Sequence, residues 1–470
     1  MKKVLTFLFC LGSLLTLSLP SASLAAQPGV VLGGGFLNSA PTMAAVQKLK
    51  PPWIRTFMPW ASIETSRGQY SSYVLGAFDQ TFAQLPVGTK LIIDVTGSPS
   101  WETGSSDPNH PPANPADYAR FMHFIAGRFA GKVAAWEIWN EEDASQFWSG
   151  SPVDAAAYTR LLQATYPAIK SADPNATVLL GGLTGEDYPF LQQVYAAGGR
   201  GYFDAVAVHT DTICDVVSPY SFIRNPFNNG PVSQWSFLGY QTVYQIMTAN
   251  GDGNKSIWMT ELGWSTDTRT CTGGAWAGTK AEGVPAATQA TFLSQAYHCV
   301  ALAPYIPVAI WFALTDTPAL DHYYGLMDAN FNAKPAFGAL RQEITSGDQL
   351  TGGCGNFTGP AIKIKGPLPN HFYSPTLPLQ IRVTASSSYN VSNIQLFYDN
   401  QLKIRGFGHP GSGPVGTLTG SINWQGWKHI SVGRHIITIK AYDPQGDVSS
   451  QSVTITSRRA HKCKPHVKKC

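Results

Sequence analysis

The feature that most constrains the fold is an eightfold alternation of short apolar, β-rich runs with segments of helical periodicity, from Val30 to about Thr345. Near-continuous apolar strands separated by helices are typical of a parallel sheet covered by helices, and eight such units match a closed (β/α)8 barrel. An open doubly wound sheet is the alternative, but no Gly-x-Gly-x-x-Gly turn follows the first run. The eight runs are VVLGGG, WIRTF, KLIIDV, VAAWEIW, TVLLGG, FDAVAVH, SIWMT and PVAIWFAL.

The pattern changes after the barrel, which we place at residues 26–346. Residues 347–358 read as a Gly-rich linker, and residues 359–457 contain short alternating strands without helical periodicity. A segment of about this length and pattern predicts a small β-sandwich. Its stretch AYDPQGDVSS resembles the end of bacterial immunoglobulin-like domains, which implies a structural, non-catalytic role.

The N-terminus has the pattern of a secretory signal. Lys2 and Lys3 precede an apolar run that ends near Leu19, and the small-residue stretch SASLAA suggests cleavage near Ala25. The run is short for a membrane span, and no later segment is a long uninterrupted apolar stretch. We therefore expect residues 1–25 to be removed and the protein to be secreted or periplasmic.

The net charge of +4 is unevenly distributed along the chain. The signal has two Lys, and residues 458–470 have six Lys or Arg and no acid, which leaves −4 for the folded body. Such a body has no global nucleic-acid footprint. The basic tail predicts contact with an anionic cell-wall or matrix polymer, and a solvated tail without a partner is the alternative.

The run WEIWNEED contains four carboxylates, of which strand alternation selects two. Glu137, Trp139 and Glu141 share one face of a strand, and carboxylates on that face belong in the barrel lumen rather than against apolar helices. Glu141 then lies at the carboxyl end of the fourth strand, where barrel active sites lie. Glu137 lies one layer deeper and is predicted to make a structural hydrogen bond.

A second carboxylate follows the seventh strand, in SIWMTELGWS. Glu261 precedes Gly263, which we expect to let the backbone turn. The fourth and seventh strands face each other across an eight-stranded barrel, so Glu141 and Glu261 can flank one bond of a substrate. Retaining glycoside hydrolysis requires this layout.

WEIWNE and TELGW resemble the acid/base and nucleophile motifs of clan A retaining glycoside hydrolases, in particular the cellulase-type and β-xylosidase-type families, which include bacterial exopolysaccharide endoglycosidases. The resemblance spans the barrel and implies hydrolysis of O-glycosidic bonds in a polysaccharide or oligosaccharide. By similarity, Glu141 is the general acid/base, Glu261 is the nucleophile and Asn140 binds the sugar 2-hydroxyl. Strand alternation alone turns Asn140 outward, so we expect the strand to bend at its end.

Two further residues are expected beside the nucleophile. Arg55, at the end of the second strand, is predicted to hold Glu261 ionised, and a structural salt bridge in the barrel is compatible with this role. His209 closes the sixth strand, where clan members often have a His near the nucleophile. Asp211 stands where they commonly have Tyr, so the partner of the nucleophile's second oxygen is left open.

Loop-borne aromatic residues are candidate platforms for sugar rings. Trp101 and Trp311 are the favoured ones, Trp264 also fits by position, and ordinary packing is the alternative for each. Weaker candidates are Trp60, Trp148, Trp235 and Trp276, and His322, Tyr323 and Tyr324 are also considered for substrate contact. An acidic polysaccharide would need basic groups in the groove, for which Arg224, Arg269 and Lys280 are the obvious candidates.

Two other functions are weighed against glycoside hydrolysis. A metal-dependent hydrolase would want clustered His ligands, but the first strand is followed by GGGFLNSAP, so we expect no metal and no cofactor. A catalytically silent carbohydrate-binding or wall-anchoring protein on the same barrel is the alternative from another class. The presence of both glutamates favours an enzyme.

Six Cys remain once Cys10 leaves with the signal. Topology predicts a bridge between Cys214 and Cys271, in neighbouring loops at the catalytic face, and a second between Cys299 and Cys354 at the opposite face. Cys463 and Cys470 then close a loop in the tail or bond to another chain. Free, buried Cys are the alternative.

Overall fold

The computed structural model describes residues 26–459, except 34–38, 211–213, 215–217, 221–233, 273–276, 279–280, 352–353, 355–359, 387–390, 392, 408, 411–416 and 443–447. The predicted signal and most of the basic tail lie outside the described residues. So do Asp211, Arg224, Trp276, Lys280, Cys463 and Cys470. Among the described helices, none combines the length and the apolar character needed to cross a membrane.

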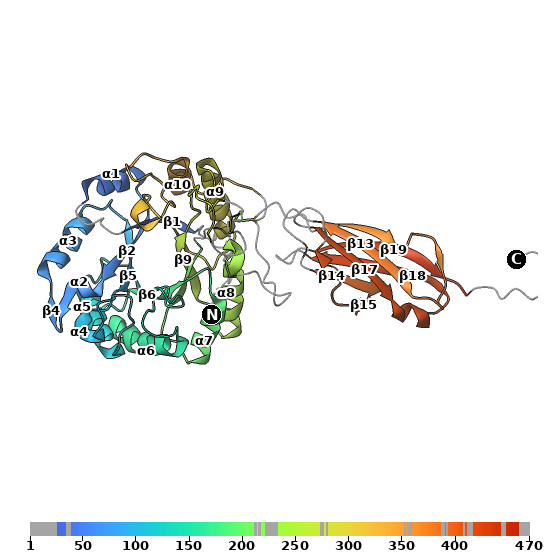
Figure 1. Ribbon diagram of the computed structural model, residues 1–470, viewed down its shortest axis with the longest axis horizontal. Helices are drawn as coiled ribbons and strands as arrows, with labels where there is room; N and C mark the ends of the chain where they lie inside the picture. The colour runs from blue at the N-terminus through green and yellow to red at the C-terminus, as the bar shows by residue number, and fades with distance from the viewer. Residues whose placement is uncertain are drawn as a thin grey trace, which may run out of the picture.

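Eight parallel strands form a closed barrel, ordered β1-β10-β9-β8-β7-β6-β5-β2, which confirms the predicted fold (Figure 1). Each of the eight predicted runs supplies one of them. The strands are β1 Gln27–Leu32, β2 Trp53–Pro59, β5 Lys90–Thr96, β6 Ala135–Asn140, β7 Thr177–Leu183, β8 Ala205–His209, β9 Ser256–Leu262 and β10 Val308–Trp311.

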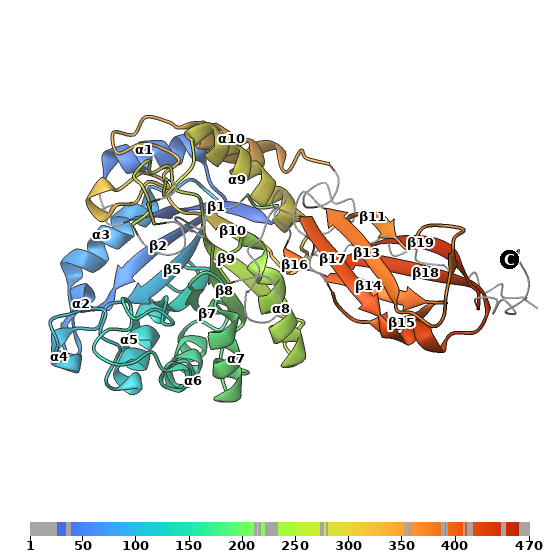
Figure 2. The same ribbon diagram turned by 45° about the vertical axis from the view of Figure 1, so that its right-hand side comes forward.

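Helices surround the barrel (Figures 1 and 2), and polar caps set where several of them begin. The side chains of Ser39, Asn114 and Asp154 accept hydrogen bonds from the first turns of α1, α5 and α6. The described α-helices are α1 Ala40–Leu49, α2 Trp60–Ile63, α3 Ser72–Ala83, α4 Ser100–Thr103, α5 Pro115–Arg128, α6 Ala155–Ala172, α7 Tyr188–Ala196, α8 Tyr240–Ala249, α9 Ala286–Ala301 and α10 Pro335–Ser346. A short hairpin, β3 Glu64–Ser66 and β4 Gln69–Tyr70, follows α2.

Alternation along the strands divides the barrel core into two clusters. In β10, Val308 and Ile310 belong to the lumen cluster, whereas Ala309 and Trp311 pack in the cluster under the helices. The same period continues past the strand, since Phe312 returns to the lumen cluster. The two-residue alternation along each strand therefore decides which side chains point into the lumen near the strand ends.

The C-terminal part is a separate all-β body of two sheets, as predicted (Figure 1). Its immunoglobulin-like class stays a prediction. Buried residues such as Ile381, Ile439 and Trp427 form its own core. One sheet is ordered β11-β13-β17-β16 and the other β12-β19-β18-β14-β15. The strands are β11 Ala361–Gly366, β12 Phe372–Tyr373, β13 Leu379–Ser386, β14 Asn393–Tyr398, β15 Gln401–Ile404, β16 His409–Pro410, β17 Thr417–Trp424, β18 Gly433–Tyr442 and β19 Val448–Ser457.

Both disulfides expected from the topology are present. Cys214–Cys271 joins the loops that follow β8 and β9, with Cα atoms 5.7 Å apart. Cys299–Cys354 ties the segment after α10 to α9. The first bridge braces two neighbouring loops on the side of the barrel where the strands end.

Candidate active site

The end of β6 departs from regular strand geometry. Trp139 and Glu141 both have a positive φ, of 70° and 47°, which is rare for non-glycine residues. As a result Trp139 packs with the helix-side cluster, and the prediction that it shares the face of Glu137 is wrong. The turn brings Asn140 into the lumen and leaves Glu141 at the rim, as the expected bend requires. Backbone strain of this kind is concentrated at functional sites.

Glu261 lies near the end of β9, and the residue that follows the strand is constrained by close packing. A Cβ on Gly263 would lie 2.6 Å from the carbonyl oxygen of Phe312. Gly263 has no positive φ, so the expected backbone freedom is not what requires glycine here. The small residue instead allows the chain after β9 to pass close to the chain after β10.

Arg55 on β2 is the centre of a buried network in the lumen. Its Nη1 donates to Glu261 Oε1 at 2.5 Å, its Nε to Glu137 Oε2 at 2.6 Å and its Nη2 to Asp94 Oδ2 at 2.7 Å. Nη2 also donates to Asn140 Oδ1 at 3.0 Å. The guanidinium is fully buried and bonded by four side chains from three strands, so it is fixed in orientation.

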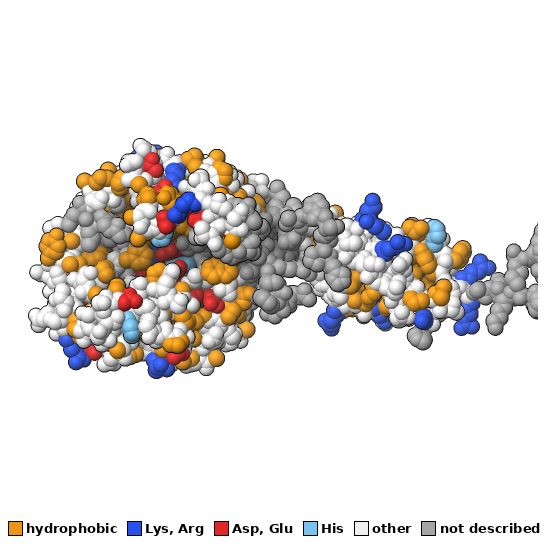
Figure 3. All heavy atoms as spheres, viewed as in Figure 1, with side chains coloured by type: hydrophobic (Ala, Val, Ile, Leu, Met, Phe, Trp, Pro, Cys, Tyr) orange, Lys and Arg blue, Asp and Glu red, His pale blue; other side chains and the backbone are white. Residues whose placement is uncertain are grey.

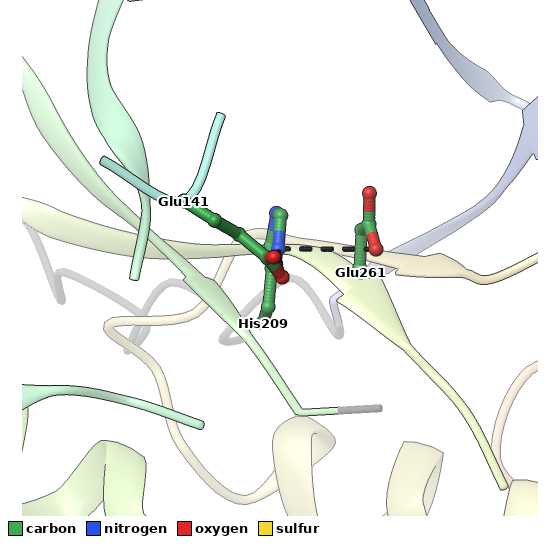
Figure 4. A group of neighbouring side chains, drawn as sticks. All are labelled: Glu141, His209 and Glu261. Atoms are coloured by element: carbon green, nitrogen blue, oxygen red, sulfur yellow. Dashed lines mark hydrogen bonds and ion pairs between the residues drawn. The ribbon is translucent and has the colours of Figure 1, made fainter. Parts of the chain in front are cut away.

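His209, the last residue of β8, lies between the two rim glutamates (Figure 4). Its Nδ1 is 2.8 Å from Glu141 Oε1 and 3.8 Å from Glu261 Oε2. The ring packs against β7, where a Cβ on Gly182 would lie 1.9 Å from Nε2, so this position has to be glycine. His209 therefore contacts the predicted acid/base directly, in addition to lying near the predicted nucleophile.

Charge and burial shift the pKa values in this network in opposite directions. Burial lowers the pKa of His209, but the charges of Glu261 and Glu141 and the hydrogen bond to Glu141 raise it to about 10. Burial raises the pKa of Glu261, while His209 and Arg55 lower it, with a net upward shift. Burial also raises the pKa of Asp94 well above its usual range, despite Arg55. His209 is thus cationic at neutral pH.

A cleft of about 700 Å³ opens above the two glutamates. Figure 3 shows the hollow mouth of the barrel with acidic and His side chains at its base. The carboxylate oxygens of Glu141 and Glu261 approach within 4.8 Å of each other at its floor. The aromatic and His residues of its walls are Phe57, Phe147, Trp235, Phe312, His322 and Tyr324.

The two tryptophans favoured from the sequence as platforms for sugar rings do not line this cleft. Trp311 is fully buried in the helix-side cluster, because alternation along β10 turns it away from the lumen. Trp101 packs edge-on against Trp60 and donates to the carbonyl of Glu64, outside the cleft. Trp264 is also buried in the core. The stacking role predicted for Trp101 and Trp311 is therefore corrected, and Trp235, with 41% of its surface exposed, lines the cleft instead.

Three residues of the site were not predicted from the sequence. Asp94 bonds Arg55, Thr260 donates to Glu137 Oε1 at 2.8 Å, and Phe312 lines the cleft. Alternation along the strands contained a signal for all three. Each is two residues from a residue of the lumen cluster: Asp94 from Ile92, Thr260 from Trp258, and Phe312 from Ile310.

Glu141, His209 and Glu261 are also the one group among the described residues whose ligand-type atoms are close enough to hold a metal ion, within 4.8 Å of one another. A metal would need the His209 nitrogen without its proton. The raised pKa of His209 favours the protonated ring, which donates to Glu141.

Comparison with known proteins shows the fold. The sequence matches no family model and no curated protein. Among solved structures, a family 39 glycoside hydrolase from Bacteroides cellulosilyticus WH2 is similar, with a TM-score of 0.55 at 18% identity, over 86% of this chain and 80% of that one. The GH39 enzyme from Xanthomonas axonopodis pv. citri has a TM-score of 0.51 at 14% identity, over 93% of this chain and 94% of that one. A monomeric β-xylosidase from Caulobacter crescentus CB15 has a TM-score of 0.50 at 15% identity, over 88% of this chain and 84% of that one.

The chain has the fold of these glycoside hydrolases. The resemblance to clan A inferred from WEIWNE and TELGW is thus confirmed at the level of the fold. In this glycoside hydrolase fold, Glu141 and Glu261 lie at opposite sides of the mouth, after β6 and on β9, with His209 of β8 between them.

We predict that His209 sets the pH at which the site works. In His209→Gln a hydrogen-bond donor remains but the positive charge is lost, so the pKa of Glu261 rises further. We expect the acidic limb of the pH profile of kcat/KM to move to higher pH and the rate at neutral pH to fall by about a hundredfold. His322→Gln, in the cleft wall, is the matched control and should not move that limb; an unmoved limb in His209→Gln contradicts the assignment.

Proposed function

We propose that this protein is a retaining glycoside hydrolase that cleaves O-glycosidic bonds of a polysaccharide or oligosaccharide by double displacement. One observation carries the proposal: two carboxylates with oxygens within 4.8 Å of each other at the floor of a cleft in a (β/α)8 barrel. Retaining enzymes need carboxyl groups about 5 to 5.5 Å apart, whereas inverting enzymes need room for a water molecule between them.

In the first step, Glu261 attacks the anomeric carbon while Glu141 gives its proton to the departing glycosidic oxygen. Arg55 holds Glu261 Oε1, so Oε2 is the oxygen that forms the glycosyl ester. In the second step, Glu141 removes a proton from water, the water attacks the anomeric carbon, and the bond to Glu261 breaks. Asn140, which is fixed by Arg55 and lines the cleft, binds the sugar 2-hydroxyl.

The charges of the network suit this sequence of steps. Arg55, which bonds Glu261 Oε1, and the cationic His209 both lower the pKa of Glu261 against the effect of burial. We assign the transferable proton to Glu141, which lines the cleft. After the glycosyl ester forms, Glu261 is no longer charged, and His209, 2.8 Å from Glu141, stabilises Glu141 as the base of the second step.

The cleft favours an uncharged sugar at the cleaved bond. Among the described residues that line it, none is Lys or Arg. Arg269, the described candidate for binding an acidic sugar, is occupied by Asp267 at 2.5 Å and by Asp321 at 2.9 Å. Phe312, Tyr324 and Trp235 instead offer the faces on which the C–H surfaces of neutral sugars stack.

Export to the periplasm or the cell exterior is part of the proposal. It rests on the signal-like N-terminus and on the two disulfides, which form in oxidising compartments. The basic tail is proposed to contact an anionic cell-wall or matrix polymer.

The stereochemistry of the product tests the mechanism. We expect a proton NMR time course on a panel of neutral glycosides to show the initial product with the anomeric configuration of the substrate. An inverted initial product would contradict the double displacement. Binding to glycans without any turnover across the panel would favour the alternative, a catalytically silent carbohydrate-binding protein on the same barrel.

A further inference from the structure

The two bodies of the chain have opposite charge. Residues 26–358 contain 17 Lys or Arg and 26 Asp or Glu, whereas residues 359–457 contain eight Lys or Arg and three Asp. The net −4 of the folded body therefore combines an acidic barrel with a basic sandwich. The excess of positive charge begins in the sandwich itself and not only in the tail. In the view of Figure 3 the sandwich surface shows Lys and Arg side chains.

The cations of the two bodies also differ in their partners. In the barrel part, 11 of the 15 described Lys and Arg make an ion pair with a carboxylate. In the sandwich, none of the eight makes one with a described residue. Asp399, the one acid that the structure describes there, instead bonds His435 and the backbone N–H of Ile436. Among the described residues, the carboxylates therefore occupy most of the barrel cations and none of the sandwich cations.

Three of these cations gather on the outer side of the four-stranded sheet. Lys363 and Lys365 are two residues apart on β11, so their exposed side chains point to the same side. Arg382 of β13 is exposed and pairs with Gly366, next to Lys365. We call this surface the basic face; its exposed uncharged polar members are Gln380, Thr419, Ser421 and Asn423.

Two structural explanations do not account for the basic face. Lys on an edge strand prevents unwanted pairing of sheets, and β11 is an edge, but Arg382 lies on the inner strand β13. A soluble surface usually mixes both signs of charge. Here the outward positions of β11, β13 and β17 hold cations, uncharged polar groups and Ala361, without a single acid among the described residues.

We propose that the basic face binds a carboxylate-bearing polysaccharide, such as a polymer of uronic acids. The cations match the carboxylates. In neighbouring rows of the sheet, Arg382 is opposite Ser421 and Gln380 is opposite Asn423, so hydroxyl and amide groups flank the charge and match the sugar hydroxyls.

Other polyanions fit the basic face less well. Its described outward positions hold no aromatic side chain on which the bases of a single-stranded nucleic acid would stack. They also hold no large apolar side chain that would enter a membrane interface. The proposal does not depend on catalysis, because binding to this face is measured without turnover.

Biolayer interferometry of the full chain on immobilised polygalacturonate, at low and high salt, tests the proposal. The triple variant Lys363→Gln, Lys365→Gln and Arg382→Gln should bind at least about tenfold more weakly, and wild-type binding should fall with salt. The matched control removes three barrel cations without described ion pairs, in Lys48→Gln, Lys50→Gln and Arg341→Gln. It should stay within about twofold of wild type.

Each other outcome overturns the proposal. Equal weakening in the triple variant and the control would mean that only net charge matters. Full loss of binding in a chain that ends at Ser457 would assign binding to the tail. Preference for double-stranded DNA or anionic lipid vesicles over polygalacturonate would replace the ligand class. A doubling of mass by light scattering that the triple variant abolishes would identify the acidic barrel of a second copy as the partner.

Discussion

Replacing the Glu261 carboxylate by an amide, in Glu261→Gln, is expected to abolish turnover. Glu261 is the proposed nucleophile, and its Oε1 is held 2.5 Å from the fully buried Arg55 guanidinium. The amide has almost the same shape but cannot form the glycosyl ester. We expect kcat to fall by about four orders of magnitude or more, with the thermal stability nearly kept. Initial rates on an activated aryl glycoside and a thermal melt measure both quantities.

Azide distinguishes the two glutamates. In Glu261→Ala, azide occupies the space of the nucleophile and should give a glycosyl azide of inverted configuration. In Glu141→Ala, the glycosyl ester on Glu261 still forms from a substrate with a good leaving group, and azide should give a product of retained configuration. Products with the opposite assignment would exchange the roles of Glu141 and Glu261, and absence of rescue in both variants would contradict the mechanism.

The fold was predictable because the signal for it is repeated. Every strand of the barrel appears in the sequence as an apolar run, and each lies between segments of helical period. Glu141 and Glu261 were accessible for a related reason: a polar residue that ends an apolar run lies at the mouth of a barrel. Neither inference needs the exact path of the backbone.

The walls of the cleft depend on backbone detail that periodicity does not contain. The positive φ of Trp139 reverses the alternation at the end of β6, so Trp139 turns to the helices and Asn140 to the lumen. Trp311 was selected for its aromatic character, although alternation along β10 points its side chain toward the helices and away from the lumen. Trp235 lies in a long loop, where no period indicates which way a side chain points.

Arg55→Met is expected to remove both activity and several kcal/mol of stability. Methionine fills part of the volume but leaves Glu137, Asp94 and Glu261 without the cation that bonds all three. Breaking a buried charge network on one side costs about 3 to 5 kcal/mol. Chemical unfolding at neutral pH measures the loss, and we expect kcat to fall about a thousandfold or more because Glu261 loses its orientation.

The deficit of Arg55→Met should shrink as the pH falls. Arg55 lowers the pKa of Asp94 and of Glu261, so in its absence both pKa values rise. A buried carboxyl with a raised pKa stabilises the folded state at low pH and loses that contribution as the pH rises through its folded pKa. The stability gap to wild type should therefore be smaller at pH 5 than at pH 7, and a gap that widens on acidification would contradict the network.

A second change separates the structural from the catalytic role of Arg55. Adding Glu137→Gln to Arg55→Met removes one uncompensated charge, so we expect part of the stability to return while activity stays lost, because Glu261 is still unsupported. Arg160→Met is the control: Arg160 is 62% exposed and pairs with Asp154, which is itself 51% exposed, so its loss should cost less than about 1 kcal/mol. Recovery of activity in the double variant would mean that Arg55 serves only to neutralise Glu137, and not to orient the nucleophile.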